Sequence, residues 1–577
     1  MDEKKYLDHL KELWDKNWPE TALKETLYPL GEIPLTEYLE QWAVLTPDKT
    51  AVIFYGYELT FKDYNEKSNQ FASFLMSKGL KKGDRVGVMM PNCPQFLIAF
   101  YGILKCGCIY VPINPMFKKT ELLYELNDAE PELLVVLDHL FPLVQSIQAE
   151  TSVKTVVTTR ISDCLPEHPT IPLPKDFTYP GPECPGSIDM MPMLARQDPD
   201  YPAVDINLDD VAALNYTGGT TGLPKGCEHT QRDMLYTIAA VIGTSIDPTT
   251  QPTQEAAQEE LGESSLLSYF PLFWIAGENA GLIAPVMTNM SLVLLTRWDA
   301  EAVLVAIDRY HVSSLVGVVD SLLEIMDRPD SRKYDLSSLK SASVSSFVTK
   351  LDANIRQNWK SLSGSTVREN SFGMTETHTS DTFTNGMQVD DMDLKARPGF
   401  CGMPVPETEL KIVDFETRQV VPLGKEGEIA IKTPSLMKGY WKNPEATAKD
   451  ILDGWFHTGD IGLIDENGYL FYIGRKKEML KIKGMSIFPT EIEHLVSMHP
   501  EVDGCSVLGK TDPEKGEIPV AFVQLKEKSR GNLTEAEITA WCHENMAVYK
   551  VPVIRFIEAL PLTVTGKIDK KELVGLT

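Results

Sequence analysis

Features that would make this a membrane or secreted protein are scarce in the sequence. The best candidate for a membrane span, residues 279–296, is uncharged, but Pro285 and Asn289 interrupt it and leave it too broken to cross a bilayer. The N-terminus opens with acidic and mixed residues and lacks the apolar core of a signal peptide. We therefore expect no integral membrane span and favour a reducing cytoplasm as the compartment.

Basic residues are also few relative to acidic ones. The 577 residues carry 55 Lys and Arg against 82 Asp and Glu, which gives a formal net charge of −27. Nucleic acids and anionic lipids both require a basic face, so neither is expected as the main partner. The acidity is uneven, because residues 474–577 hold 15 basic and 15 acidic side chains. This neutral segment offers local cationic patches for phosphates.

The cysteine spacing gives no sign of a zinc site. The tightest pair, Cys106 and Cys108, is one residue too close for the usual C-x₂-C spacing, and we interpret the nine cysteines as buried or incidental thiols. Internal repeats are absent as well. A content of 43% hydrophobic and 24% charged residues is ordinary for a globular protein, and the length is sufficient for three or four domain-sized units.

The most informative segment that is present is residues 216–226, YTGGTTGLPKG. Its glycines let backbone amides approach an anion, its threonines add hydroxyl donors, and Lys225 supplies a cation. It differs from a Walker loop, because Pro224 precedes Lys225 and Gly226 follows it. The apolar run 210–215 reads as a buried strand, so the loop would project from a strand end. The segment predicts a polyphosphate site; taken alone, it is also compatible with a plain surface turn.

Six further segments settle that choice. They are residues 370–377 (NSFGMTET), 439–447 (GYWKNPEAT), 455–460 (WFHTGD), 474–484 (GRKKEMLKIKG), 489–493 (PTEIE) and 561–569 (PLTVTGKID). Together with the loop, and in this order, they resemble the adenylate-forming superfamily, which includes acyl-CoA synthetases, carrier-protein adenylation domains and beetle luciferases. The resemblance covers nearly the whole chain.

Strand-like runs at 85–90 and 133–137 alternate with helical stretches such as 94–104, which predicts a layered α/β architecture. Strands near 409–413 and 427–432 suggest a small β-rich subdomain. The resemblance implies a large N-terminal AMP-binding core of several subdomains, residues 1–473, followed by a mobile α+β C-terminal lid, residues 474–577, which rotates about a hinge at Lys477.

Three less regular regions carry expectations of their own. Prolines cluster between residues 161 and 205 and predict a long irregular connection or insertion. The polar stretch 247–263 is expected to be a mobile loop or a helical turn. Residues 280–287 read as a buried helix that leads into a strand at 291–296.

The chemistry follows from what a carboxylate needs before a thiol can attack it. It must acquire a leaving group, and attack on the α-phosphorus of ATP supplies one by expelling pyrophosphate, in a step that depends on charge neutralisation. The resemblance implies ATP and AMP contacts from Thr217, Gly218, Gly219, Thr220, Thr221, Gly222, Lys225, Phe372, Gly373, Thr375, Asp460 and Arg475. Among these, Phe372 would face adenine and Asp460 would accept the ribose hydroxyls.

The catalytic set implied by the resemblance is Lys567, Glu376 and Thr220. Lys567 would reach both the substrate carboxylate and the α-phosphate. Mg²⁺, held by Glu376 and Thr220, would bridge phosphate oxygens. The resemblance also implies that Lys483 and Gly484 lie beside the pantetheine tunnel of CoA, where a glycine leaves the room that a narrow tunnel needs. A helix-capping or turn glycine is the alternative reading of Gly484.

The acyl pocket is assigned to Trp274, Gly277 and Phe347. Trp274 stands where many relatives carry histidine, and Ser345, Ser346 and Phe347 replace a smaller Gly-Gly-Ala wall. These bulkier residues are either gates for the substrate or ordinary packing.

We therefore predict an ATP-dependent acyl-CoA ligase that uses Mg²⁺, ATP and CoA and favours a medium- or long-chain fatty acid. Aryl or branched acids, or a carrier-protein thiol as acceptor, are alternative readings. A non-catalytic scaffold is disfavoured by the intact set Lys225, Glu376, Asp460 and Lys567. A homodimer is compatible with the sequence.

Overall fold

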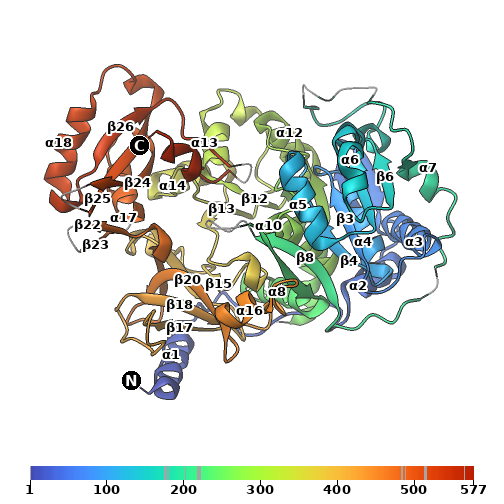
Figure 1. The fold of residues 1–577 in the computed structure, drawn as a ribbon, viewed down its shortest axis with the longest axis horizontal. Coiled ribbons are helices and arrows are strands. Elements are labelled where there is room, and N and C mark those ends of the chain that lie inside the picture. The colour runs from blue at the N-terminus through green and yellow to red at the C-terminus, as the bar shows by residue number, and fades with distance from the viewer. Residues whose placement is uncertain are drawn as a thin grey trace.

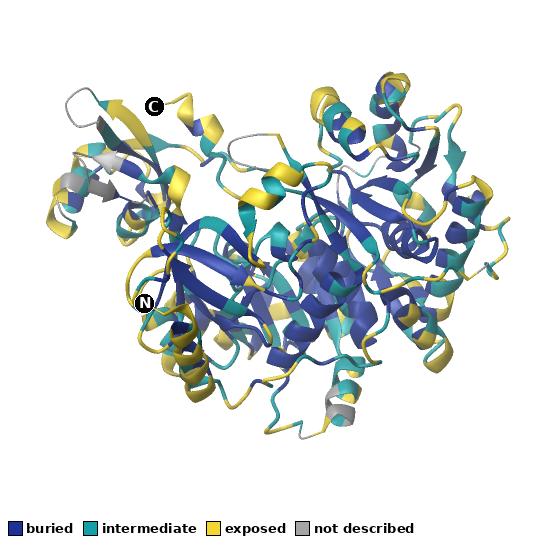
Figure 2. Ribbon diagram, turned by 60° about the horizontal axis from the view of Figure 1, so that its bottom comes forward, coloured by how far each residue is buried: buried dark blue, intermediate teal, exposed yellow. Residues whose placement is uncertain are grey.

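The described residues form four β-sheets (Figure 1). The computed structural model describes residues 2–174, 177, 181–201, 203–217, 223–251, 253–482, 485–487, 489–512, 516–546, 548–563 and 566–576. Two seven-stranded, largely parallel sheets form the centre, an antiparallel sheet adjoins them, and a smaller sheet near the C-terminus stands apart. Buried segments concentrate in the central sheets (Figure 2). This layered α/β core with a separate α+β C-terminal part is the predicted fold class.

One central sheet has the strand order β7-β6-β5-β3-β4-β8-β9. Its strands are β3 (Arg85–Met89), β4 (Ile109–Pro112), β5 (Leu133–Leu137), β6 (Thr155–Thr159), β7 (Ile188–Asp189), β8 (Val211–Thr217) and β9 (Lys225–Thr230). All neighbours are parallel except β8 and β9, which form an antiparallel hairpin. The associated helices are α4 (Pro94–Lys105), α5 (Lys119–Ala129) and α6 (Phe141–Ile147). The strands predicted at 85–90, 133–137 and 210–215 and the helix at 94–104 are confirmed.

The second central sheet has the order β14-β13-β12-β10-β11-β1-β2. Its strands are β1 (Thr50–Phe54), β2 (Tyr57–Thr60), β10 (Ser265–Ser268), β11 (Ser291–Leu294), β12 (Ser314–Val318), β13 (Ser341–Ser345) and β14 (Thr366–Glu369). Its neighbours are parallel apart from β1 and β2. Because parallel strands share their carboxyl ends, the loops after β12, β13 and β14 meet at one edge.

Helices complete this N-terminal part. They are α1 (Glu3–Asn17), α2 (Leu35–Leu45), α3 (Phe61–Ser77), α7 (Met190–Leu194), α8 (Gln231–Ser245), α9 (Gln254–Glu263), α10 (Ile275–Gly277), α11 (Ala284–Thr288), α12 (Ala300–Tyr310), α13 (Val319–Asp327), α14 (Ala353–Ser363), α15 (Met392–Lys395) and α16 (Pro444–Asp450). No helix among the described residues is both long enough and apolar enough to cross a bilayer.

The antiparallel sheet is the β-rich subdomain predicted from residues 409–432. It comprises β15 (Thr382–Phe383), β16 (Phe400–Pro404), β17 (Glu409–Val413), β18 (Gly427–Lys432), β19 (Ile451–Leu452), β20 (Trp455–Ile464) and β21 (Leu470–Arg475). Helix α1 docks against it, where the Trp14 indole donates a 2.8 Å hydrogen bond to the Gly468 carbonyl. The sheet therefore ties the N-terminus to the end of the core.

The C-terminal part has its own sheet, of order β23-β22-β25-β24, with β26 parallel to β25. Its elements are β22 (Leu480–Ile482), β23 (Met485–Ile487), α17 (Pro489–Ser497), β24 (Val502–Asp512), β25 (Gly516–Leu525), α18 (Glu535–Asn545), β26 (Val553–Ile557) and α19 (Lys570–Val574). Side chains such as Ile492, Val507 and Ile538 are fully buried in a separate apolar cluster. The boundary between residues 473 and 474 stays a prediction.

Three local outcomes refine the expectations. The polar stretch 247–263 contains a ten-residue helix, α9, rather than only a loop. The helix expected at 280–287 begins as a π-helix, Glu278–Ile283, and continues as α11. In the proline-rich region the described residues form a 3₁₀ turn, the short strand β7 and the short helix α7, which fits the irregular connection that was predicted.

Candidate active site

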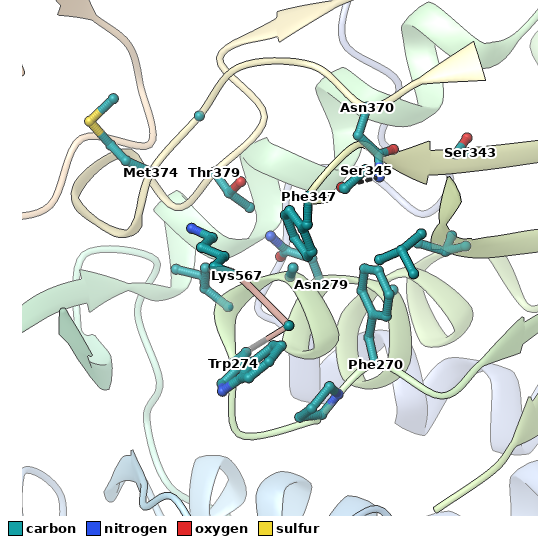
Figure 3. A pocket seen from close by; sticks show the side chains of 18 of the residues that line it. Phe270, Trp274, Asn279, Ser343, Ser345, Phe347, Asn370, Met374, Thr379 and Lys567 are labelled. Atoms are coloured by element: carbon teal, nitrogen blue, oxygen red, sulfur yellow. Dashed lines mark hydrogen bonds between the residues drawn. The ribbon is translucent and has the colours of Figure 1, made fainter. Parts of the chain in front are cut away.

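A cleft with a volume of about 2200 Å³ lies between the core and the C-terminal part. Its lining combines Trp274 and Asn370 from the core with Leu560 and Lys567 from the C-terminal part. Figure 3 shows Lys567, Phe347 and Trp274 around one opening, with Asn370, Ser345 and Ser343 nearby. The predicted site residues that line it are Trp274, Phe347, Gly373, Thr375, Arg475, Lys477 and Lys567.

The predicted phosphate loop closes the β8–β9 hairpin. Thr217 and Lys225 pair across the two strands, which places both at the base of the loop. The five residues between them that carry the phosphate prediction, Gly218, Gly219, Thr220, Thr221 and Gly222, lie outside the described residues. The roles assigned to those five, including the catalytic and metal roles of Thr220, stay predictions.

Two residues that the sequence reasoning did not assign to the site hold the Lys225 ammonium. Its Nζ lies 3.6 Å from the centroid of the Tyr440 ring and 3.4 Å from Asp450 Oδ2. A cation over an aromatic face beside a carboxylate is well stabilised. Tyr440 belongs to the 439–447 segment and could have been found there, whereas Asp450 carries no sequence signal of its own.

Tyr440 also links Lys225 to Glu376. The Tyr440 hydroxyl lies 3.1 Å from Glu376 Oε1 and 3.3 Å from Asp450 Oδ2, so its single hydrogen can be donated to either carboxylate. The Met437 amide donates to the Glu376 carbonyl at 2.9 Å and anchors the 3₁₀ turn Thr375–Thr377. Glu376 Oε2 has no donor among the described residues. The structure thus brings the predicted phosphate and metal residues Lys225 and Glu376 into one cluster.

Asp460 and Arg475 face each other on β20 and β21, where they are direct partners in the register. Asp460 is only 3% exposed, and its Oδ1 lies 3.1 Å from Arg475 Nε without receiving a well-directed hydrogen bond. Burial raises the pKa of Asp460 to about 6, although the positive charge of Arg475 acts in the opposite direction. A buried acceptor that lacks a donor is suited to a ligand hydroxyl.

Phe372 and Gly373 shortly precede Glu376 in the 370–377 segment. The Phe372 ring stands 6.0 Å from the Tyr472 ring, at an interplanar angle of 34°. A Cβ on Gly373 would approach the Ser380 amide nitrogen to 2.3 Å, so the turn tolerates only glycine there. The Thr375 carbonyl is 2.8 Å from His229 Nε2, which fixes the start of the next turn.

Lys567 projects into the cleft from the C-terminal part (Figure 3). Its Nζ lies 5.9 Å from the centroid of the Phe347 ring, and no carboxylate of the described residues forms an ion pair with it. Enclosure by the cleft lowers its pKa, the Arg475 charge lowers it further, and Asp460 partly compensates. Lys567, Arg475 and Asp460 therefore share one electrostatic environment even though they come from both parts of the protein.

The remaining residues assigned to the C-terminal part are placed less completely. Lys477 lines the cleft and lies in the 3₁₀ turn Lys476–Glu478, directly after β21. Lys483 and Gly484, assigned to CoA, lie outside the described residues.

The predicted acyl pocket divides into lining and supporting residues. Trp274 lines the cleft and packs edge-on against Phe273, with ring centroids 5.7 Å apart. Phe347 lines the cleft opposite Lys567. Gly277 is buried and is not among the residues that line the cleft; a Cβ there would meet the Pro271 carbonyl oxygen at 2.0 Å. Its place is thus a close backbone contact behind the wall.

A buried polar network behind the site escaped the sequence reasoning. Glu278 and His378 are completely buried, and their side chains approach to 3.4 Å. Asn215 on β8 donates to the other oxygen of Glu278 at 2.7 Å. Burial raises the pKa of Glu278 to about 7 despite this hydrogen bond and the nearby His229. The network joins β8 of the phosphate hairpin, the residue directly after the 370–377 segment, and the helical segment that follows Trp274 and Gly277. The available sequence signal was a charged residue at the edge of an apolar helix.

Comparison with known proteins places this geometry in a family. The AMP-binding enzyme family matches residues 39–441, and the AMP-binding enzyme C-terminal domain matches residues 491–567. A long-chain-fatty-acid–CoA ligase of Bacillus subtilis (strain 168) is 33% identical over 562 residues, covering 95% of each chain. 4-Coumarate–CoA ligase 1 of Petroselinum crispum is 29% identical, covering 95% of this chain and 94% of the relative.

The fold is also similar to that of a solved CoA ligase structure. The anthranilate CoA ligase AuaEII, in complex with anthranoyl-AMP, superposes with a TM-score of 0.77 at 28% identity and covers 94% of this chain and 97% of that one. The family match spans most of the core, and the fatty-acid–CoA ligase is similar almost from end to end. The chain belongs to the AMP-binding enzyme family and is an AMP-forming acid–CoA ligase, which activates a carboxylic acid with ATP through an acyl adenylate.

Proposed function

We propose that this ligase joins an aliphatic acid of the medium- or long-chain class to CoA, with Lys567 as the residue that assists adenylate formation. The observation that carries this proposal is the position of Lys567, inside the cleft and beside Phe347. An ammonium without a carboxylate partner among the described residues is available for the substrate carboxylate and the α-phosphate. Its charge would oppose the negative charge that accumulates as the new bond forms.

The other predicted site residues would bind different parts of the nucleotide. Lys225 and Thr217, at the base of the hairpin, would hold the β- and γ-phosphates with the loop between them. Asp460, which is buried and lacks a donor for one oxygen, would accept the ribose hydroxyls, with Arg475 beside it. Phe372 would face adenine. The first two assignments are supported by residue pairs on adjacent strands, and the assignment of Phe372 rests on the family to which the chain belongs.

The donor set near Glu376 fits Mg²⁺. Mg²⁺ is usually held by one or two carboxylates together with substrate phosphates, so a single available oxygen, Glu376 Oε2, beside the phosphate cation Lys225 suits it. When bound, Mg²⁺ would neutralise charge on the phosphate oxygens.

Thioester formation would require the C-terminal lid, residues 474–577, to turn a different face to the core. Lys477, in the turn after β21, is the proposed hinge. Lys483 and Gly484 are proposed to line the path of the CoA arm. A carrier-protein thiol is the alternative acceptor.

The wall of the cleft formed by α8 supports an aliphatic substrate. It is lined by Ile238, Val241 and Ile242 of α8, by Ile246 directly after that helix, and by Leu261 of α9. Apolar surface of this kind buries an alkyl chain favourably. The Bacillus subtilis relative is named for a long-chain fatty acid.

An aryl or branched acid is the second candidate, favoured by the aromatic residues Phe270, Trp274 and Phe347 at the cleft. Flat rings stack well against such side chains. The Petroselinum crispum and AuaEII relatives are named for aromatic acids.

Incubation of the purified protein with ATP, Mg²⁺ and a panel of aliphatic and aromatic acids tests the proposal. Pyrophosphate release without a thiol measures adenylation, and AMP release with CoA or with a carrier protein identifies the acceptor. Aliphatic acids with CoA should give the highest kcat/KM. A clear preference for aromatic acids, or for the carrier protein, would overturn the proposed substrate or acceptor.

A further inference from the structure

The cleft has a second wall, and it is polar. Strands β12, β13 and β14 run parallel, with Ser314 beside Ser341, and Ser343 beside Arg368. Serines 314, 341, 343 and 345 and Arg368 all line the cleft. On the other face of the same strands, Ala342, Val344 and Val367 are fully buried. Alternation along the strands therefore turns the hydroxyls and the arginine toward the substrate space.

Arg368 has only part of its hydrogen-bonding capacity satisfied. Its Nε donates to Ser343 Oγ at 2.8 Å, while its two terminal nitrogens find no acceptor among the described residues. The adjacent Glu369 points away and binds the backbone amide of Ser346 at 2.7 Å. Burial lowers the pKa of Arg368 to about 10, which still leaves the guanidinium charged at neutral pH.

Two other cations, the buried Arg356 and the cleft-lining Lys340, are paired, whereas Lys567 resembles Arg368 in having no carboxylate ion pair among the described residues. Arg356 contacts Asp391 at 2.8 Å and Asp393 at 2.6 Å. Lys340, at the edge of the same polar wall, contacts Glu260 at 2.8 Å. A charge that is partly removed from water is costly unless a group of opposite charge offsets the lost hydration. The described residues supply no carboxylate partner for Arg368, which is partly exposed and lines the cleft, so a ligand in the cleft can supply one.

We propose that Arg368 binds a second carboxylate on the acyl chain, so that the preferred acid is an α,ω-dicarboxylic acid. The inference rests on the proposed function and narrows its aliphatic acid. Arg368 lies on β14, two residues before Asn370 and so about 6.6 Å back along the strand direction, and both residues line the cleft. The planar guanidinium matches a carboxylate in a two-bond fork, and Ser343 holds it in place.

The test compares matched pairs of acids with wild type and three variants. Adipate is paired with hexanoate, and suberate with octanoate. Arg368→Met removes the charge at similar length, Arg368→Lys keeps the charge but loses the fork, and Arg332→Met makes the same change at an exposed arginine outside the cleft lining. Pyrophosphate release gives kcat/KM, calorimetric titration of each acid in the presence of AMP gives binding without turnover, and the melting temperature of every variant reports folding.

Wild type should favour one of the dicarboxylates over its matched monocarboxylate. Arg368→Met should reduce that preference on the order of 10²-fold, while its kcat/KM for the monocarboxylate stays the same or rises. The preference of Arg368→Lys should lie between those of wild type and Arg368→Met. Arg332→Met should behave as wild type.

Equal activity and binding for both members of every pair in wild type would overturn the inference and leave the proposed function standing. An equal loss for both classes of acid in Arg368→Met would also overturn it, by showing a structural role. If no acid is turned over but a dicarboxylate binds in an Arg368-dependent manner, the proposed function fails and the inference is supported.

Discussion

Asp460 and Arg475 lie opposite each other on two adjacent strands, with Arg475 Nε 3.1 Å from Asp460 Oδ1. Even so, this buried oxygen of Asp460 receives no well-directed hydrogen bond. The pair is therefore incomplete within the protein. A ribose would complete it, because each ribose hydroxyl brings the donor that Asp460 lacks.

This incompleteness predicts a pH dependence. Because the pKa of Asp460 is raised to about 6, protonation below that pH removes the charged acceptor, and kcat/KM for ATP should fall as the pH drops through about 6. Asp460→Asn should lower ATP affinity and lose this limb of the profile. An unchanged acid limb in the variant would assign the titration to another group.

The raised pKa of Asp460 also affects stability, but in the opposite direction: kcat/KM should fall as the pH drops, whereas stability should fall as the pH rises. Between the unfolded value near 4 and about 6, the folded state holds more protons than the unfolded one. The unfolding free energy of wild type relative to Asp460→Asn should therefore fall as the pH rises through this window. Urea titrations of both proteins at several pH values measure the difference, and a rising difference would contradict the burial argument.

Lys567→Ala should lose on the order of 10²-fold or more in acid-dependent pyrophosphate release, because the cleft then lacks the cation that stabilises the forming bond. CoA transfer from presynthesised acyl adenylate should be largely retained. Lys526→Ala, at an exposed lysine outside the cleft lining, is the control. Equal losses in both half-reactions would contradict the proposal that Lys567 acts in adenylate formation only.

Glu376→Gln keeps the shape of the side chain but removes the charge proposed to hold Mg²⁺. The Mg²⁺ concentration for half-maximal rate should rise and turnover should fall, roughly tenfold or more for the loss of one charged interaction. Tyr440→Phe, which removes only the hydroxyl 3.1 Å from Glu376, should have a smaller effect. Wild-type metal dependence in Glu376→Gln would reassign the residue to structure.

Lys477→Pro tests the hinge. Proline fixes φ near −65°, so the lid should be trapped in one orientation, and one half-reaction should suffer much more than the other. Lys477→Ala separates this torsional effect from loss of the side chain. If both half-reactions keep their wild-type rates in Lys477→Pro, the hinge lies elsewhere.

Trp274→Ala tests the gate at the acid entrance. Opening that space should change discrimination between acids by about 1 to 3 kcal/mol in favour of longer or bulkier ones, with little change in ATP affinity. Trp274→Phe should give an intermediate ranking. The same ranking of acids in a stably folded Trp274→Ala protein would identify the indole as ordinary packing.

The sequence by itself determined the family, the α/β class and most individual elements, because these depend on local order. The spacing of glycines and threonines before Lys225 and the alternation of runs such as 85–90 and 94–104 can be read along the chain. The sequence was less informative where the tertiary surroundings decide the structure. The polar stretch 247–263, for example, could equally have been a loop, but it contains helix α9.

Tertiary structure alone decided which distant residues share an environment. Only the fold places Tyr440 and Asp450 against Lys225, encloses Glu278 beside His378, and leaves Arg368 without a carboxylate partner among the described residues. These relationships depend on the direction of each side chain and on what lies across the space it enters. A one-dimensional pattern fixes neither, since strand register and sheet packing bring together segments separated by hundreds of residues.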